Sequence, residues 1–213
     1  HLVKEEKKLC EYTFFEPCVG TGNFVFSYLK AIRNAGISIE EVPILLGNIY
    51  VADVNAAALK VYKESLSELV YLYWGIQLDN TYFKTHIGSG LLVDVTAPQP
   101  SYIPLEKVFT REGCKIKFDI VVTNPPYKNL KAERGHYFSD DEYENDKIKY
   151  SLISKIISKS FFYSTDGILN LYKLFVEEII DRYASDKAYV SLLIPSSILS
   201  DKTCEKLRTH MLM

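Results

Sequence analysis

The chain has 213 residues, of which 47% are hydrophobic and 24% are charged, and its formal net charge is −2. This composition is typical of one folded domain and argues against disorder over the whole chain. A slightly negative segment is not expected to bind a polyanion tightly by itself. No apolar run reaches the roughly 20 residues that span a bilayer, and the charged opening HLVKEEKKLCE is not typical of a signal peptide, so we expect no membrane partner.

Short apolar runs alternate with helical patterns along the chain. Strands are expected at 12–15, 48–53, 81–92, 117–124 and 188–195, and helices at 23–34, 55–73, 170–184 and from Ser200 onward. The runs DIVV and YVSLLI are apolar without alternation, which indicates burial on both faces of a parallel sheet. The pattern predicts an α/β fold with a Rossmann-like, doubly wound and mostly parallel sheet.

Two segments interrupt the alternation and predict surface or substrate loops. Residues 93–115 contain three prolines and indicate an excursion over the surface before the fourth strand. Residues 128–160 mix both charge signs with aromatic side chains directly after that strand. Lids and substrate loops occupy this place in α/β proteins, and a plain solvated loop is an equal alternative.

The cysteines are scattered, with no C-x-x-C pair and no histidine at ligand spacing. This spacing argues against a zinc site and a disulfide framework, and it fits a reducing cytoplasm. His86 and His136 have no acid or nucleophile at a telling distance, so we expect both to be structural. The chain starts at His1 and stops at LRTHMLM inside a helical pattern, so we expect a piece of a longer protein.

The segment FFEPCVGTGNF places Gly20 and Gly22 between the first strand and the first helix. Glycines there let the backbone turn tightly and let a nucleotide-like ligand approach closely. Asp53 closes the second strand, where a carboxylate can bind both hydroxyls of a ribose. Glu16 precedes the glycines; it would repel a pyrophosphate but suits a ligand with an amino group and a positive sulfur. S-adenosylmethionine is such a ligand, and NAD is the alternative.

The fourth strand ends in Asn124, Pro125, Pro126 and Tyr127. Paired prolines end the strand and stiffen its tip. The Asn124 side-chain oxygen and the Pro125 carbonyl can accept both hydrogens of an exocyclic amino group, which makes that nitrogen more nucleophilic. Tyr127 offers a face on which a planar base can stack. A sulfonium methyl donor is already activated, so we expect no metal.

Five motifs then resemble one family in order and spacing, over most of 13–199. They are EPCVGTGNF (16–24), YVAD (50–53), DIVVTNPPY (119–127), NLYKLFVEEII (170–180) and VSLLIPSSIL (190–199). The family is the gamma-like N6-adenine DNA methyltransferases of bacterial restriction–modification enzymes. The resemblance implies that residues 1–213 form one partial methyltransferase catalytic domain, truncated at both ends, which methylates the N6 amino group of adenine in DNA.

The resemblance also implies roles for the matching residues. Asp53 would bind the ribose of S-adenosylmethionine. Ser89 stands where the family usually has an Asp or Asn that reads the cofactor's adenine, with a plain turn residue as the equal alternative. The methionine part of the cofactor would lie against Glu16, Pro17, Gly20, Gly22, Asn23 and Phe24. An adenine flipped out of double-stranded DNA would be gripped by Asn124, Pro125, Pro126 and Tyr127.

The implied partners are a target-recognition domain or subunit and a nuclease domain or subunit. The family's first cofactor motif and last strands have no match in this chain. NPPY alone also occurs in enzymes that methylate RNA adenine or protein glutamine, so those substrates remain alternatives. A non-catalytic dinucleotide-binding module, with NPPY as a stiff turn, is a further one. Lys128, Lys131 and Arg134 can reach phosphates beside a flipped base, although acidic residues 140–144 make a mixed solvated loop the plainer interpretation.

Overall fold

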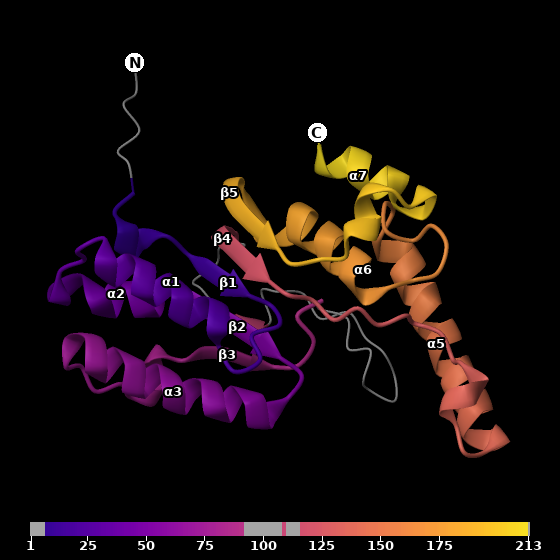
Figure 1. Ribbon diagram of the computed structural model, residues 1–213, viewed down its shortest axis with the longest axis horizontal. Helices are drawn as coiled ribbons and strands as arrows, with labels where there is room; N and C mark the ends of the chain where they lie inside the picture. The colour runs from indigo at the N-terminus through magenta and orange to yellow at the C-terminus, as the bar shows by residue number, and fades with distance from the viewer. Residues whose placement is uncertain (1–6, 92–107, 110–115, 213) are drawn as a thin grey trace.

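The computed structural model describes residues 7–91, 108–109 and 116–212 (Figure 1). Within them, five parallel strands form one sheet in the order β3-β2-β1-β4-β5, which confirms the predicted doubly wound α/β fold. The strands are β1 (Phe14–Glu16), β2 (Ile49–Asp53), β3 (Lys84–Ile87), β4 (Phe118–Thr123) and β5 (Ala184–Leu192). Most of the loop expected at 93–115 lies outside the described residues.

Helices cover both faces of the sheet (Figure 1). One face carries α1 (Asn23–Asn34), α2 (Val42–Gly47) and α3 (Ala56–Trp74). The other face packs against the π-helical turn Ile179–Tyr183, which continues α6 (Leu171–Glu178). Against α6 pack α5 (Asp140–Ser160) and α7 (Glu205–Met211). Shorter 3-10 turns span Leu9–Glu11, Ile39–Glu41, Asn80–Tyr82, Arg134–His136, Ser196–Leu199 and Lys202–Cys204.

Strands β1 and β2 are buried on both faces. The same burial was predicted for the runs DIVV and YVSLLI, but β4 is only partly buried, and Tyr189 and Val190 of the edge strand β5 are 72% and 40% exposed. Phe14 and Val51 belong to the core under α1 and α3, whereas Phe15 and Tyr50 belong to the core on the opposite face. Side chains alternate between the faces of a strand, so a strand with apolar residues at every position is covered on both sides. This burial makes the carboxyl ends of β1 and β2 a rigid base for the loops that follow them.

The bounds of α1 and α3 agree closely with the sequence prediction, because each has a recognisable start. Gly22 caps α1 with a left-handed backbone (φ 103°), and α1 begins at Asn23. The Asn55 side chain accepts hydrogen bonds from the amides of Ala57 (3.0 Å) and Ala58 (3.2 Å) at the start of α3. Gly75 ends α3 in the left-handed region (φ 70°).

Several elements differ from the predicted ones. The strand expected at 81–92 is limited to β3 (Lys84–Ile87). The short helix α2 was not expected, because six residues carry too little periodicity to indicate a helix. β5 begins at Ala184, where the helix over 170–184 was expected to end and well before the predicted strand at 188. Its pairing with β4 is irregular, since Phe118 pairs with Ala184 and Ile120 pairs with Tyr189. The polar residues SDK (185–187) in this irregular stretch hid the strand.

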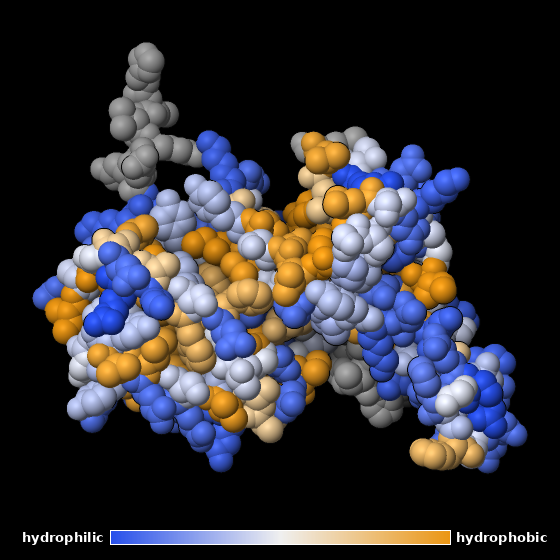
Figure 2. Space-filling view, in the orientation of Figure 1, coloured by the Kyte–Doolittle hydropathy of each residue, from blue (hydrophilic) through white to orange (hydrophobic). Residues whose placement is uncertain are grey.

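The segment 128–160 is not one loop, since its second half forms the 21-residue helix α5. Ser139 caps this helix by accepting a hydrogen bond from the Glu142 amide (3.2 Å), and three acidic residues follow in the first turn. Ile153 and Ile157, four residues apart, pack into the core beside α6. The remaining surface of the helix is mostly polar, although Ile148 and Leu152 are exposed, and its projecting end is mostly hydrophilic in Figure 2. A narrow apolar face explains why the sequence predicted a surface or substrate loop here and not a helix.

Candidate functional site

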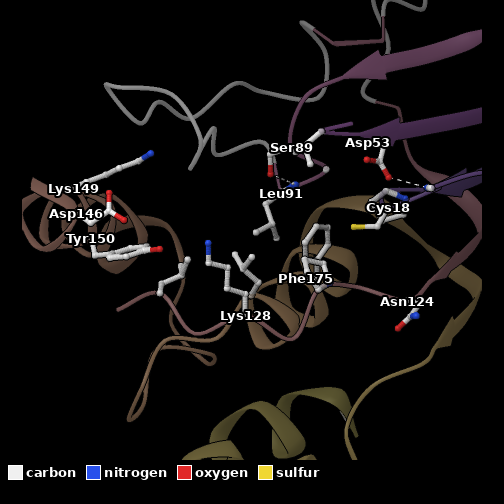
Figure 3. Close-up of a pocket in the computed structure, with 17 residues that line it drawn as sticks. Cys18, Asp53, Ser89, Leu91, Asn124, Lys128, Asp146, Lys149, Tyr150 and Phe175 are labelled. Atoms are coloured by element: carbon white, nitrogen blue, oxygen red, sulfur yellow. Dashed lines mark hydrogen bonds between the residues drawn. The ribbon is translucent and has the colours of Figure 1, made fainter. Parts of the chain in front are cut away.

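A cavity of about 590 Å³ lies outside the carboxyl ends of the strands (Figure 3). The sheet order changes direction between the neighbours β1 and β4, because the chain winds outward from β1 to β3 and then returns to β4 and β5. Such a switch point leaves a crevice between the two diverging connections, and open α/β sheets bind ligands there. The volume is within the range of about 300 to 1,000 Å³ that small-molecule sites occupy.

The glycine loop after β1 is held against the end of β2. The Gly20 amide donates to Asp53 Oδ2 at 2.8 Å, and the Asn55 amide donates to Asp53 Oδ1 at 2.8 Å. Gly20 has a left-handed backbone (φ 54°), and an added Cβ there would meet no described atom within 4 Å. Gly22 is required for packing, because a Cβ at this position would lie 2.6 Å from the ring of Tyr62. The loop therefore presents bare backbone and an oriented carboxylate to the cavity.

Asp53→Ala is expected to weaken the affinity for S-adenosylhomocysteine by about 10- to 100-fold, because the ribose acceptor predicted from the sequence and the anchor of the Gly20 amide would both be lost. The full-length protein can be tested by isothermal titration calorimetry. Asp79→Ala is the matched control: Asp79 also accepts a backbone hydrogen bond, from Thr81 at 2.8 Å, but does not line the cavity. Equal cofactor affinities of the two variants would contradict a binding role for Asp53.

The loop after β3 forms the next part of the wall and packs directly on the glycine loop. Ser89 lines the cavity, and its Oγ accepts a hydrogen bond from the Leu91 amide at 3.2 Å. This bond gives Ser89 a turn-forming contact, and the side chain still borders the cavity. A Cβ on Gly90 would lie 2.1 Å from the Pro17 carbonyl oxygen. The two loops can therefore meet only because residue 90 is glycine.

The Asn-Pro-Pro-Tyr tip follows β4 at the other side of the switch point. Asn124 and Pro126 line the cavity, whereas Pro125 is buried beneath them. The Tyr127 hydroxyl lies 2.8 Å from Asn124 Oδ1 and 2.7 Å from the Leu193 carbonyl oxygen. One hydroxyl carries one hydrogen, so the two acceptors share it. Tyr127 thereby ties the Asn124 amide to the residue that follows β5.

The chain just beyond the tip is paired with the start of α6. The Leu171 amide donates to the Lys128 carbonyl at 2.9 Å, and the Leu130 amide donates to the Leu169 carbonyl at 2.8 Å. Between them, Asn170 Nδ2 donates to Asn129 Oδ1 at 2.8 Å. These bonds hold the tip beside α6, whose first turns contribute apolar side chains to the cavity wall.

Glu16 lies beneath the cavity rather than on its wall. Its side chain is 2% exposed, and its Oε2 atom has no hydrogen-bond partner within the part of the chain that the structure describes. Burial raises the pKa of Glu16 to about 9, against a backbone hydrogen bond from Val25 and together with the negative charge of Asp53. The carboxyl group is therefore protonated at neutral pH in the folded protein without a bound ligand.

Glu16→Gln is expected to make stability less dependent on pH. The folded pKa of about 9 is above the ordinary value of 4.5. The folded protein therefore keeps a proton that the unfolded chain releases, and the free energy of unfolding falls as pH rises across this window. At pH near 8 the variant should be more stable by about 1 to 3 kcal/mol, because the wild-type chain must take up a proton at Glu16 when it folds and the glutamine variant need not. Urea unfolding at several pH values measures this. Burial also raises the pKa of Glu178, to about 8, but this contribution is the same in both proteins and cancels in the comparison. An equal pH dependence of stability in the two proteins would therefore contradict the prediction for Glu16.

The structure brings part of the predicted set together around one cavity. The predicted residues that line it are Pro17, Gly20, Asp53, Ser89, Asn124 and Pro126. Gly22, Asn23 and Phe24 form the start of α1 behind the glycine loop and are not among the lining residues. Tyr127 borders two outer hollows, and its ring meets the edge of Tyr172 at 6.2 Å between centroids.

Sequence reasoning did not assign the other lining residues to a cofactor or catalytic site, although it had considered Lys128 as a phosphate contact. The further lining residues are Cys18, Val54, Gly90, Leu91, Lys128, Leu130, Asp146, Lys149, Tyr150, Leu171 and Phe175. Leu171 and Phe175 lie in the NLYKLF motif, so the motif itself was a usable signal. Asp146, Lys149 and Tyr150 come from α5 and carried no local signal. Burial raises the pKa of the Cys18 thiol, so that side chain is a neutral part of the wall.

The described residues offer neither a metal-ligand cluster nor a disulfide. Among them, no group of three His, Cys, Asp or Glu side chains could hold a metal ion. Cys10, Cys18 and Cys204 are free thiols. No helix of the described segments is long and apolar enough to cross a bilayer.

The strand order and the ligand crevice define the chain as having the fold of class I S-adenosylmethionine-dependent methyltransferases. More specifically, the family model described as Eco57I restriction-modification methylase matches residues 47–213, which is most of the chain. The chain belongs to the Eco57I restriction-modification methylase family. No curated protein matches it.

Several solved structures share the fold at low sequence identity. A DrdV–DNA complex matches with a TM-score of 0.67 and 15% identity, over 97% of this chain and 19% of that one. A nuclease-deletion mutant of the Type ISP restriction-modification enzyme LlaGI, in complex with a DNA substrate mimic, has a TM-score of 0.68 and 16% identity over 96% of this chain and 17% of that one. A putative class I S-adenosylmethionine-dependent methyltransferase from Listeria monocytogenes has a TM-score of 0.51 and 13% identity over 99% and 46%. The chain thus spans about a fifth of the DrdV chain.

Proposed function

We propose that the chain transfers a methyl group from S-adenosylmethionine to the N6 amino group of adenine in DNA, within a larger restriction–modification enzyme. The observation that carries the proposal is that Asn124 and Pro126 border the same cavity as Gly20 and Asp53. A group that can bind an aromatic amine and a loop that can bind a nucleoside therefore border one cavity. Family membership supports the same reaction.

The residues present fit the cofactor. Open space next to Gly20 leaves room for a ligand against the backbone, and Asp53 offers carboxylate oxygens to a ribose. Leu91 and Phe175 supply apolar walls for a planar base. Glu16 Oε2, beneath the loop, has no hydrogen-bond partner among the described residues. It can accept a hydrogen bond from a ligand in the cavity or lie near a positively charged group of that ligand. The cofactor, when bound, supplies an activated methyl group on a positive sulfur.

The tip performs the remaining chemistry in this proposal. Asn124 Oδ1 already receives a shared hydrogen bond from Tyr127 and, as an amide oxygen, has a second lone pair for a substrate hydrogen. The Pro125 carbonyl offers the second acceptor. As both acceptors draw the amino hydrogens toward them, electron density on the nitrogen is freed for attack. The fixed prolines leave little reorganisation for the moment of reaction.

The proposed partners follow from the size of the chain relative to similar structures. A piece that spans 19% of the DrdV chain and 17% of the LlaGI chain leaves room for other domains in those proteins. We propose that target recognition, and nuclease activity where present, reside outside this segment, in a cytoplasmic enzyme. Double-stranded DNA with an adenine flipped out of the helix is the proposed substrate, because adenine within the stack cannot reach into a recessed cavity.

The experiment that tests the proposal is methyl transfer by the full-length protein from tritiated cofactor, with separate DNA, RNA and protein substrates. Label is expected in DNA, and enzymatic digestion to nucleosides should place it on N6-methyl-2′-deoxyadenosine. Label only in RNA or protein would assign the same chemistry to another substrate. A calorimetric preference for NAD over S-adenosylhomocysteine would remove the methyltransferase reading.

A further inference from the structure

A second hollow of about 490 Å³ adjoins the cavity on the outer side of the tip. It lies between the segment 127–137 and the first half of α5. Lys128, Asp146 and Tyr150 border both spaces, so the two hollows meet at these side chains. Tyr127 borders the outer hollow but not the cavity, which places the candidate catalytic tip at the boundary between them.

The cations near this hollow are not equivalent. Lys131 pairs with Glu133 at 3.1 Å, and Arg134 pairs with Asp140 at 2.6 Å. Lys128 has no carboxylate at ion-pair distance among the residues that the structure describes. Among these three cations, Lys128 is therefore the one without an ion pair. The Asp146 carboxylate, which also borders both hollows, accepts a hydrogen bond from the Tyr137 hydroxyl at 2.8 Å.

The backbone of Lys128 is fixed while its side chain is exposed. Its carbonyl accepts the Leu171 amide at 2.9 Å, and it stands two residues after Pro126. In Figure 3 the side chain points into the cavity. Four methylene groups let a lysine ammonium turn about a fixed backbone and reach either hollow. The charges of the ligands in the cavity and in the outer hollow therefore decide which of the two spaces the Lys128 ammonium group occupies.

The proposed cofactor disfavours the inner position. S-adenosylmethionine carries a positive sulfur and an ammonium group against one carboxylate, so a third positive charge in the same low-dielectric space is repelled. Nucleic acid brings the opposite charge, because each nucleotide that flanks a flipped base carries a phosphate, and proteins position the strand through such phosphates. The outer hollow is therefore the place where the Lys128 ammonium group can contact a DNA phosphate.

We propose that Lys128 binds a phosphate of the DNA strand next to the flipped adenine, in the hollow between residues 127–137 and α5. This inference rests on the proposed function, since it needs DNA at the tip. It assigns the contact to one of three neighbouring cations, because the other two already form ion pairs with Glu133 and Asp140. Lys128 thereby sets the register of the strand relative to Asn124.

The test is a salt titration of DNA binding by the full-length protein with S-adenosylhomocysteine present, using a fluorescein-labelled duplex of mixed sequence. Losing one phosphate contact reduces the slope of log K against log salt by about 0.9. Lys128→Gln should show this change, with an affinity roughly tenfold weaker near 0.1 M salt. Lys131→Gln and Arg134→Gln are the matched controls and should change the slope by less than half as much. Thermal unfolding should be unchanged in all three variants, because the three side chains are at the surface.

The outcomes separate the two proposals. If the wild-type protein neither binds nor methylates DNA, the proposed function fails and this inference fails with it. If the wild-type protein binds DNA but Lys128→Gln keeps the full salt slope, only the phosphate contact is wrong. Weaker binding of S-adenosylhomocysteine to Lys128→Gln, with unchanged DNA binding, would instead assign the lysine to the cofactor and overturn the inference.

Discussion

Replacing Asn124 with alanine is expected to lower kcat by about 10²- to 10³-fold, the effect of removing one preorganised polar group from an active site. The dissociation constant for the cofactor should change by less than about threefold, because the glycine loop and Asp53 are untouched. The amide oxygen contacts the substrate amine in the proposed reaction, and Tyr127 holds it in position. Single-turnover methylation, combined with calorimetry for the cofactor, measures the two quantities separately.

Two further variants sharpen this test. Asn124→Asp keeps an acceptor oxygen at the same place and should retain more activity than alanine. Tyr127→Phe keeps the ring but removes the hydroxyl that bridges Asn124 and Leu193, so kcat should fall less than in Asn124→Ala. Turnover of Asn124→Ala within about tenfold of the wild-type rate would contradict the acceptor role.

The sequence was informative wherever a short stretch carries its own physical reason. Gly20, Gly22 and Asp53 were predicted because a tight turn and a strand-end carboxylate are local features, and the structure places the Gly20 amide on Asp53. The same holds for Asn124, since a strand followed by two prolines must end there. These residues lie on three different elements, and the parallel sheet brings their carboxyl ends to one edge.

Residues whose position depends on distant contacts could not be predicted in this way. Gly90 looks like an ordinary turn residue until the loop after β1 is placed against it. Asp146, Lys149 and Tyr150 border the cavity only because α5 packs on α6 through Ile153 and related side chains. Helix–helix packing of this kind leaves no mark within a single segment. Glu16 shows the reverse case: its motif indicated a cofactor contact, and the structure adds that the carboxyl group is buried beneath the loop.

Gly90→Ala is expected to lower the free energy of unfolding by about 3 kcal/mol, near the upper end for overpacking a buried position. The added Cβ would lie 2.1 Å from the Pro17 carbonyl oxygen and 2.7 Å from the Pro17 Cβ. Pro17 directly follows β1, whose side chains are all buried, so its backbone has little room to withdraw. Gly90 is held from the other side as well, because the Tyr183 hydroxyl donates to its carbonyl. Urea unfolding of the full-length protein measures the loss.

Gly20→Ala is the matched comparison: it should lose little stability but much of its affinity for the cofactor. Its left-handed backbone (φ 54°) makes alanine unfavourable by only about 1 kcal/mol. No described atom lies within 4 Å of the added Cβ, so the folded protein without ligand should tolerate it. The methyl group instead takes space where the cofactor backbone contact is proposed, and affinity for S-adenosylhomocysteine should fall at least about tenfold. If Gly20→Ala lost more stability than Gly90→Ala, or kept full cofactor affinity, the division between a packing glycine and a binding glycine would be wrong.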